Sequence, residues 1–178
     1  MTDNTNDLTI PVNENDHIQG STDAPLVVVE YGDFECSYCG AAYPIIKKLQ
    51  QQLGDDLCLV FRSFPLSQVH PHALHAADAA EIADSQGKFW EYHDLLYEHQ
   101  HSLDDAALVH HATSLGLDGA AFKRSLQQGE FKDKVQQSFM GGVESGVNGT
   151  PSFFVNGSRY DGDWEYEPFL EYLKGLSN

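Results

Sequence analysis

The sequence predicts an α/β fold, in which a small sheet is interrupted by an all-helical insertion. Near the start, the run from Leu26 to Val29 is apolar without alternation, which is typical of a strand covered on both faces. From His70 to about Val147 the apolar residues follow helical spacing, and no strand pattern interrupts them. Strand signals then return around Asn156-Gly157, a dipeptide that favours a tight hairpin turn.

The length and charge of the chain narrow the function classes. With 178 residues it fits one domain, large enough to bury an ordinary core. Its 27 acidic and 10 basic side chains give a formal net charge of −17 at pH 7. Nucleic acids and anionic membranes attract Lys and Arg rather than carboxylates, so we expect no nucleic-acid partner.

Residues 1–20 are polar and are predicted to be a lead-in rather than a domain, with residues 16–20 as a loop that delivers the chain to the first strand. They hold no basic start with an apolar run, as a signal peptide has, and no later stretch approaches the ~20 apolar residues that span a bilayer. We therefore expect no membrane insertion, and a cytoplasmic location for the sequence as written. The location is periplasmic instead if a signal sequence has been removed.

The first predicted strand, Leu26 to Tyr31, is followed closely by a helix that continues to Gly54. Cys36 and Cys39 lie at the start of this helix. Unpaired backbone N–H groups and a partial positive charge at a helix N-terminus stabilise an anion, which lowers the pKa of a thiol placed there. Cys36 is therefore the predicted nucleophile, and Cys39, one turn deeper, can resolve a mixed disulfide.

A Cys-x-x-Cys pair has two other interpretations, half of a zinc site or a structural disulfide. A zinc site needs two more ligands, and the only other cysteine, Cys58, has no metal-ligand spacing around it. Cys58 lies in an apolar run and is expected to be a core thiol. The histidines, including His70, His72 and His75, also lack matching ligands, so no metal site is predicted. A Cys-x-x-Cys pair that follows a buried strand favours redox chemistry.

A second buried strand is predicted from Leu57 to Phe64, ending before Pro65. Arg62 interrupts its apolar run, as Glu30 interrupts the first strand. A buried charge is costly unless it is paired or neutralised. A cross-strand ion pair between Glu30 and Arg62 would account for both residues, whereas Glu30 at a strand edge in water is the other interpretation.

The remaining elements follow from helical spacing, capping residues and turn signals. The insertion is predicted to hold helical segments at 72–83, 89–99, 104–115, 118–126 and 131–146. After it come a hairpin, 151–155 and 158–160, and a last helix at 164–174.

Four segments together resemble the DsbA-like branch of the thioredoxin superfamily. They occur in the family's order and are VVVEYGDFECSYC, FRSFPL, GKFWEYHDLL and GTPSFFVNG. The resemblance covers the chain from about Pro25 to the C-terminus. It implies a thioredoxin-like fold with its core in residues 21–66 and 148–178, and a helical insertion in residues 67–147.

The resemblance implies a protein thiol–disulfide oxidoreductase whose redox centre is a Cys36–Cys39 disulfide, with no separate cofactor. It also implies that a buried acid at Glu30 assists proton transfer at the resolving cysteine. Through the pairing suggested above, Arg62 joins Glu30 as a candidate for proton transfer or for tuning the reduction potential. The expected partners are protein or peptide thiols and disulfides and a redox partner, for a chain that acts as a monomer.

The resemblance further implies a cis peptide bond between Thr150 and Pro151 beside Cys36. These two residues, with Ser37 and Tyr38, are the predicted substrate groove. The Ser37-Tyr38 dipeptide matches neither the Pro-His of DsbA nor the Gly-Pro of thioredoxin, so the direction of exchange stays open.

Two other functions remain open on the sequence alone. One is a non-catalytic redox-sensing or adaptor domain whose disulfide controls binding of a partner. The other is a DsbA-related glutathione transferase or isomerase. Those enzymes usually replace the first cysteine by serine, so the intact Cys36 and Cys39 pair counts against this second alternative.

Overall fold

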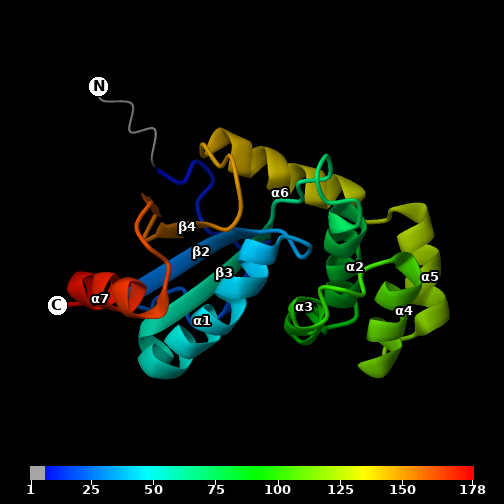
Figure 1. The fold of residues 1–178 in the computed structure, drawn as a ribbon, viewed down its shortest axis with the longest axis horizontal. Helices are drawn as coiled ribbons and strands as arrows, with labels where there is room; N and C mark the ends of the chain where they lie inside the picture. Colours follow the sequence, from blue (N-terminus) through cyan, green and yellow to red (C-terminus); the bar gives the residue numbers. More distant parts are fainter. Residues whose placement is uncertain (1–6) are drawn as a thin grey trace.

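A single five-stranded sheet organises the molecule. The computed structural model describes residues 7–178, and its strands are β1 (His17–Gln19), β2 (Leu26–Gly32), β3 (Leu57–Ser63), β4 (Ser152–Val155) and β5 (Ser158–Tyr160). Their order across the sheet is β1-β3-β2-β4-β5 (Figure 1). Strands β2 and β3 run parallel, and the other neighbouring pairs are antiparallel.

Strand β2 lies at the centre of the sheet, between β3 and β4, because its β-branched and apolar residues suit burial on both faces. The parallel register places Glu30 opposite Phe61, and Tyr31 opposite Arg62. Successive side chains of a strand point to opposite faces of the sheet. Glu30 and Phe61 therefore lie on one face, and Tyr31 and Arg62 lie on the other.

Seven α-helices are found in residues 7–178. They are α1 (Ser37–Leu53), α2 (Ala73–Ser85), α3 (Phe89–Glu98), α4 (Asp105–Ser114), α5 (Gly119–Gln128), α6 (Lys132–Glu144) and α7 (Tyr166–Leu176). Helices α1 and α7 pack together on one face of the sheet, and α6 crosses the other face next to β3 (Figure 1). Helices α2 to α5 form a bundle at one end of the sheet (Figure 1).

The apolar side chains form three buried clusters, one for each of these interfaces. The cluster beneath α1 and α7 includes Val28, Leu59 and Phe169, and the cluster beneath α6 includes Val29, Val60 and Phe154. The third cluster joins the start of α1 to the helical bundle. It contains Phe34, Cys36, Cys39, Phe61, Tyr92, Leu96 and Tyr97. Both cysteines thus belong to the core that fixes the bundle against the sheet.

The N-terminal segment differs from its prediction at residues 16–20, which were expected to form a loop. Within residues 1–20, His17–Gln19 form strand β1, which pairs with Phe61, Val60 and Leu59 of β3. Residues 1–6 of the predicted lead-in lie outside the described part of the chain. Three residues are too few to show a hydrophobic period, so this strand becomes visible only through its backbone pairing with β3.

Candidate active site

Cys36 occupies the N-cap position of α1, with extended backbone dihedral angles. Its side chain is 5% exposed, whereas Cys39, one turn further along the helix, is completely buried. The Thr150–Pro151 peptide bond is cis, and Cys36 Sγ lies 3.6 Å from the carbonyl oxygen of Thr150. The tertiary structure therefore brings the two cysteines together with a loop more than a hundred residues away.

The two thiols have very different acidities. A hydrogen bond from the Cys39 thiol is the largest influence on Cys36, and together with backbone N–H groups of Tyr38 and Cys39 it lowers the pKa of Cys36 to about 5, against the effect of burial. Burial instead raises the pKa of Cys39 well above its ordinary value, and the neighbouring Cys36 and Glu30 add to this. At neutral pH Cys36 is a thiolate and Cys39 is a thiol.

Asp33 organises the turn between β2 and α1. Its Oδ1 accepts a hydrogen bond from the Glu35 N–H, its Oδ2 accepts one from the Leu66 N–H, and its carbonyl oxygen accepts one from the Cys36 N–H. The same carboxylate forms an ion pair with Nδ1 of His70 at 2.8 Å. Burial alone would lower the pKa of His70, but the hydrogen bond and the charge of Asp33 outweigh it and raise the pKa.

Gln100 supports the same turn from the loop after α3. Its Nε2 donates hydrogen bonds to the carbonyl oxygens of Phe34 and Cys36, each at 2.9 Å. Gly40 makes this approach possible, since a Cβ at that position would overlap the Gln100 side-chain amide. The backbone around Cys36 is therefore held by two side chains. Asp33 comes from the turn between β2 and α1, and Gln100 comes from the loop after α3.

Glu30 lies on the same face of β2 as the buried cysteines and is 3% exposed. Burial raises the pKa of its carboxyl group to about 8. Within residues 7–178 no hydrogen bond or ion pair engages this carboxyl group. At neutral pH it is mostly protonated, which is how a chain tolerates an unpaired carboxyl group in an apolar strand.

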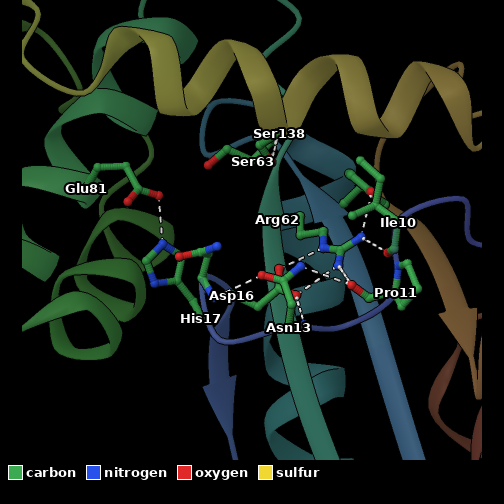
Figure 2. A network of polar contacts seen from close by, with 11 residues as sticks. Ile10, Pro11, Asn13, Asp16, His17, Arg62, Ser63, Glu81 and Ser138 are labelled. Atoms are coloured by element: carbon green, nitrogen blue, oxygen red, sulfur yellow. Dashed lines mark hydrogen bonds and ion pairs between the residues drawn. The ribbon is translucent and has the colours of Figure 1, made fainter.

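The suggested ion pair between Glu30 and Arg62 is wrong. Arg62 points to the opposite face, where its guanidinium binds both carboxylate oxygens of Asp16 at 2.8 Å (Figure 2). It donates a hydrogen bond to the Tyr31 hydroxyl. It also donates to the carbonyl oxygens of Ile10 and Pro11. The register explains the error, because the residue beside Glu30 is Phe61, one position before Arg62.

The predicted groove residues lie around Cys36, at the surface. Ser37 and Tyr38 begin α1 and are exposed, with Tyr38 at 67%. Thr150 and Pro151 are half-buried and lie next to Cys36. The four predicted groove residues are thus all at least partly exposed, and Thr150 contacts the Cys36 thiol.

One group among residues 7–178 has the spacing of metal ligands, and it lies away from the cysteines. The ligand atoms of His17, Glu81 and Asp84 are all within 4.8 Å of one another. His17 Nε2 lies 2.7 Å from Glu81 (Figure 2), and Lys134 Nζ also lies 2.7 Å from Glu81. These partners compensate the buried carboxylate, so the group acts as an ion-pair network that joins β1, α2 and α6.

Comparison with known proteins identifies the family. The profile of a family described as thioredoxin matches residues 12–175. The chain belongs to this thioredoxin family. Its predicted thioredoxin-like α/β fold is confirmed by this match and by the similarity to solved DsbA-like structures described next.

Three solved structures share the fold over nearly the whole chain. BdbD from Bacillus subtilis aligns with a TM-score of 0.85 and 23% identity, covering 94% of this chain and 96% of that one. A thioredoxin-like oxidoreductase from Silicibacter pomeroyi DSS-3 has a TM-score of 0.80 and 26% identity, covering 93% and 94%. Alpha-DsbA1 from Wolbachia pipientis has a TM-score of 0.81 and 21% identity, covering 95% and 94%.

The curated relatives carry a different name. A protein named Na(+)/H(+) antiporter NhaA 1 from Salinispora arenicola is 44% identical over 162 residues, which are 90% of this chain and 25% of that protein. Its namesake from Mycobacterium sp. strain KMS is 40% identical over 163 residues, 90% of this chain and 27% of that protein. The chain thus spans about a quarter of the length of these relatives. Among residues 7–178 no helix is long and apolar enough to cross a membrane.

Sequence reasoning missed the residues that reach the cysteines from distant segments. His70 lies 37 positions after Asp33, and Gln100 lies 64 positions after Cys36. Tyr97, whose side chain packs in the same cluster as both cysteines, lies inside the predicted helical segment 89–99, and no local pattern marks it. Asp33 follows a buried strand and precedes a helix, and that position was the one local signal available for this group.

Proposed function

We propose that this chain is a protein thiol–disulfide oxidoreductase, with Cys36 as nucleophile and Cys39 as resolving cysteine. The observation that carries the proposal is the contrast between them: a thiol that is 5% exposed with a pKa of about 5, beside a completely buried thiol whose pKa is well above 9. Cys36 is the good leaving group and Cys39 the poor one. Cys36 therefore reacts with the substrate first, and Cys39 resolves the mixed disulfide second.

In the reducing direction, the Cys36 thiolate attacks a substrate disulfide. A bond forms between Cys36 Sγ and one substrate sulfur, and the second substrate sulfur leaves as a thiolate. Glu30 first loses its own proton to solvent and then accepts the proton of Cys39. Cys39 attacks Cys36 Sγ, which closes the Cys36–Cys39 disulfide and releases the first substrate sulfur as a thiolate. The substrate gains two electrons and the cysteine pair loses them, so a dithiol redox partner must restore the pair.

The oxidising direction reverses these steps, and the acidities favour it. When a substrate thiolate attacks Cys36 of the disulfide, Cys39 leaves as a thiolate that needs a proton. Glu30 holds a proton at neutral pH, because its pKa is about 8, and the pKa of Cys39 lies higher still. Proton transfer from Glu30 to Cys39 is therefore downhill. We propose a disulfide oxidase for an oxidising compartment such as the periplasm.

The substrate groove is the exposed surface around Cys36. Pairing of an extended client chain with the Thr150 backbone would place the client's sulfur over Cys36, with Ser37 and Tyr38 beside it. Such a groove recognises the backbone of a client chain rather than its side chains, which suits protein and peptide clients. The expected unit is a monomer that meets clients and its redox partner at this same surface.

The test is turnover of a dithiol peptide with glutathione disulfide as the terminal oxidant. The wild-type chain should turn over many times, whereas Cys36→Ser should have no activity. Cys58→Ser is the matched control, because Cys58 is buried in β3 and its loss should leave the rate unchanged. Activity that persists in Cys36→Ser would contradict the assignment.

A second function, a redox-sensing module, is favoured by the curated relatives. There the matched segment is a quarter of a protein named as an antiporter, which suits a domain whose disulfide state controls an attached or bound transporter. The same assay separates the two functions. A sensor reacts once per chain and stops, whereas an oxidoreductase continues until the peptide is consumed.

A further inference from the structure

The hydroxyl group of Tyr97 is a buried polar group with no partner. The side chain is 6% exposed, and its oxygen makes no hydrogen bond within residues 7–178. A tyrosine hydroxyl can donate one hydrogen bond, and burying it unpaired costs stability. Phenylalanine would fill the same space without this cost. The chain therefore has a hydroxyl group at a position where packing alone would be satisfied by phenylalanine.

The position of this hydroxyl is defined by β2. A Cβ on Gly32 would lie 2.9 Å from the Tyr97 oxygen, so the hydroxyl occupies the space that a side chain at Gly32 would take. Gly32 and Glu30 are two positions apart in β2 and point to the same face of the sheet. Helix α3 thus places the hydroxyl on the face of β2 that carries Glu30, whose carboxyl group is also unpaired and whose charge acts on Tyr97.

The surroundings of Tyr97 hold its ring in place and exclude water. Its ring centroid lies 5.1 Å from that of Phe34 and 5.5 Å from that of Tyr43, and both cysteines belong to the same buried cluster. After burial, the groups that raise the pKa of Tyr97 are Cys39, Glu30, Asp33 and Cys36, in that order. His93 faces it from its own helix. The hydroxyl keeps its proton and is available only as a donor to an anion.

We propose that the Tyr97 hydroxyl is a positioning hydrogen-bond donor for proton transfer between Glu30 and Cys39. When Glu30 gives its proton to the leaving Cys39 sulfur, the Tyr97 O–H donates to the new carboxylate of Glu30. In reverse, the proton returns from Cys39 to Glu30 and the O–H turns toward the Cys39 thiolate. Tyr97 keeps its own proton throughout, and no bond to it forms or breaks. The inference rests on the proposed exchange reaction but names a residue outside it.

The test compares Tyr97→Phe with Tyr92→Phe. Tyr92 is a second buried tyrosine of α3, but its hydroxyl donates to the Leu108 carbonyl oxygen and not toward the cysteines. The first readout is the pKa of Glu30, followed by NMR of its carboxyl carbon in the reduced protein. Removing the donor should raise this pKa by about one unit or more, since hydrogen bonds to charged groups are the stronger ones. Tyr92→Phe should leave it unchanged.

The second readout is the rate of the step in which Cys39 leaves or attacks. Tyr97→Phe should slow this step roughly tenfold, whereas alkylation of Cys36 should keep its rate and its pH midpoint. Combining Tyr97→Phe with Glu30→Gln should cost no more than Glu30→Gln alone. An unchanged pKa of Glu30 in Tyr97→Phe would overturn the inference, whatever the rates. If that pKa shifts while the wild-type chain fails to exchange disulfides, the hydrogen bond stands and the proposed function falls.

Discussion

His70 and Asp33 form an ion pair in which the imidazole Nδ1 lies 2.8 Å from the carboxylate Oδ2. Asp33 is fully buried in the turn that holds Cys36, and His70 brings a positive charge to it from the loop between β3 and α2. The charge of Cys36 is among those that raise the pKa of His70. By reciprocity, a protonated His70 stabilises the Cys36 thiolate.

Replacing His70 by Asn should therefore change the pH dependence of the free energy of unfolding. It should also raise the pKa of Cys36, because the thiolate loses a stabilising positive charge. The pKa of His70 is raised in the folded state, so its contribution to the free energy of unfolding is fully present below the unfolded pKa of about 6.5. It is lost as the pH rises through the folded value. Urea unfolding between pH 5 and 9 should show this loss in the wild type and not in His70→Asn. Identical pH profiles would contradict the role.

Two substitutions of Cys39 should separate its two effects on Cys36. Cys39→Ser keeps a hydrogen-bond donor, so Cys36 should stay acidic while mixed disulfides accumulate, because nothing resolves them. Cys39→Ala removes the donor and should raise the pKa of Cys36 by roughly one to two units from about 5. Thiolate absorbance during a pH titration measures the shift. Equal titration curves for both variants would show that the Cys39 hydrogen bond does not set this acidity.

Replacing Glu30 by Gln should stabilise the protein at neutral and higher pH. The pKa of this carboxyl group is raised from 4.5 to about 8, so the folded state holds a proton that the unfolded state releases. The free energy of unfolding therefore falls as the pH rises between these values, by on the order of 5 kcal/mol. Denaturant unfolding should show a smaller fall in Glu30→Gln. The same variant should exchange disulfides more slowly, since Cys39 loses its proton donor.

Arg62 should matter for stability and not for redox chemistry. Its guanidinium and Asp16 form a buried pair that joins the N-terminal segment to β3, and removing one partner leaves the other unpaired. Arg62→Ala should lower the free energy of unfolding by about 3–5 kcal/mol. Under conditions where the variant is folded, the pKa of Cys36 should be unchanged. A shift in that pKa comparable to the shift in His70→Asn would mean that Arg62 acts at the site after all.

Local sequence determined the parts of the site that need only short spacing. Cys36 and Cys39 lie three residues apart, and a buried strand before them with helical periodicity after them places both at a helix N-terminus in any fold of this kind. The helical insertion and the hairpin at Asn156-Gly157 were predictable in the same way, whereas the cis bond at Thr150-Pro151 was implied only by the family resemblance. Each depends on backbone preferences or on periods that a few neighbouring residues reveal.

Only the tertiary structure decided which buried charged residues form ion pairs with one another. Glu30 and Arg62 look equivalent in the sequence, as single charges in apolar strands. The parallel register of β2 and β3 sends them to opposite faces, where one stays unpaired beside Cys39 and the other binds Asp16. Tyr97 and His70 reach the site from separate segments of the insertion. Register and helix docking are set by the packing of the whole core, so no local pattern carries them.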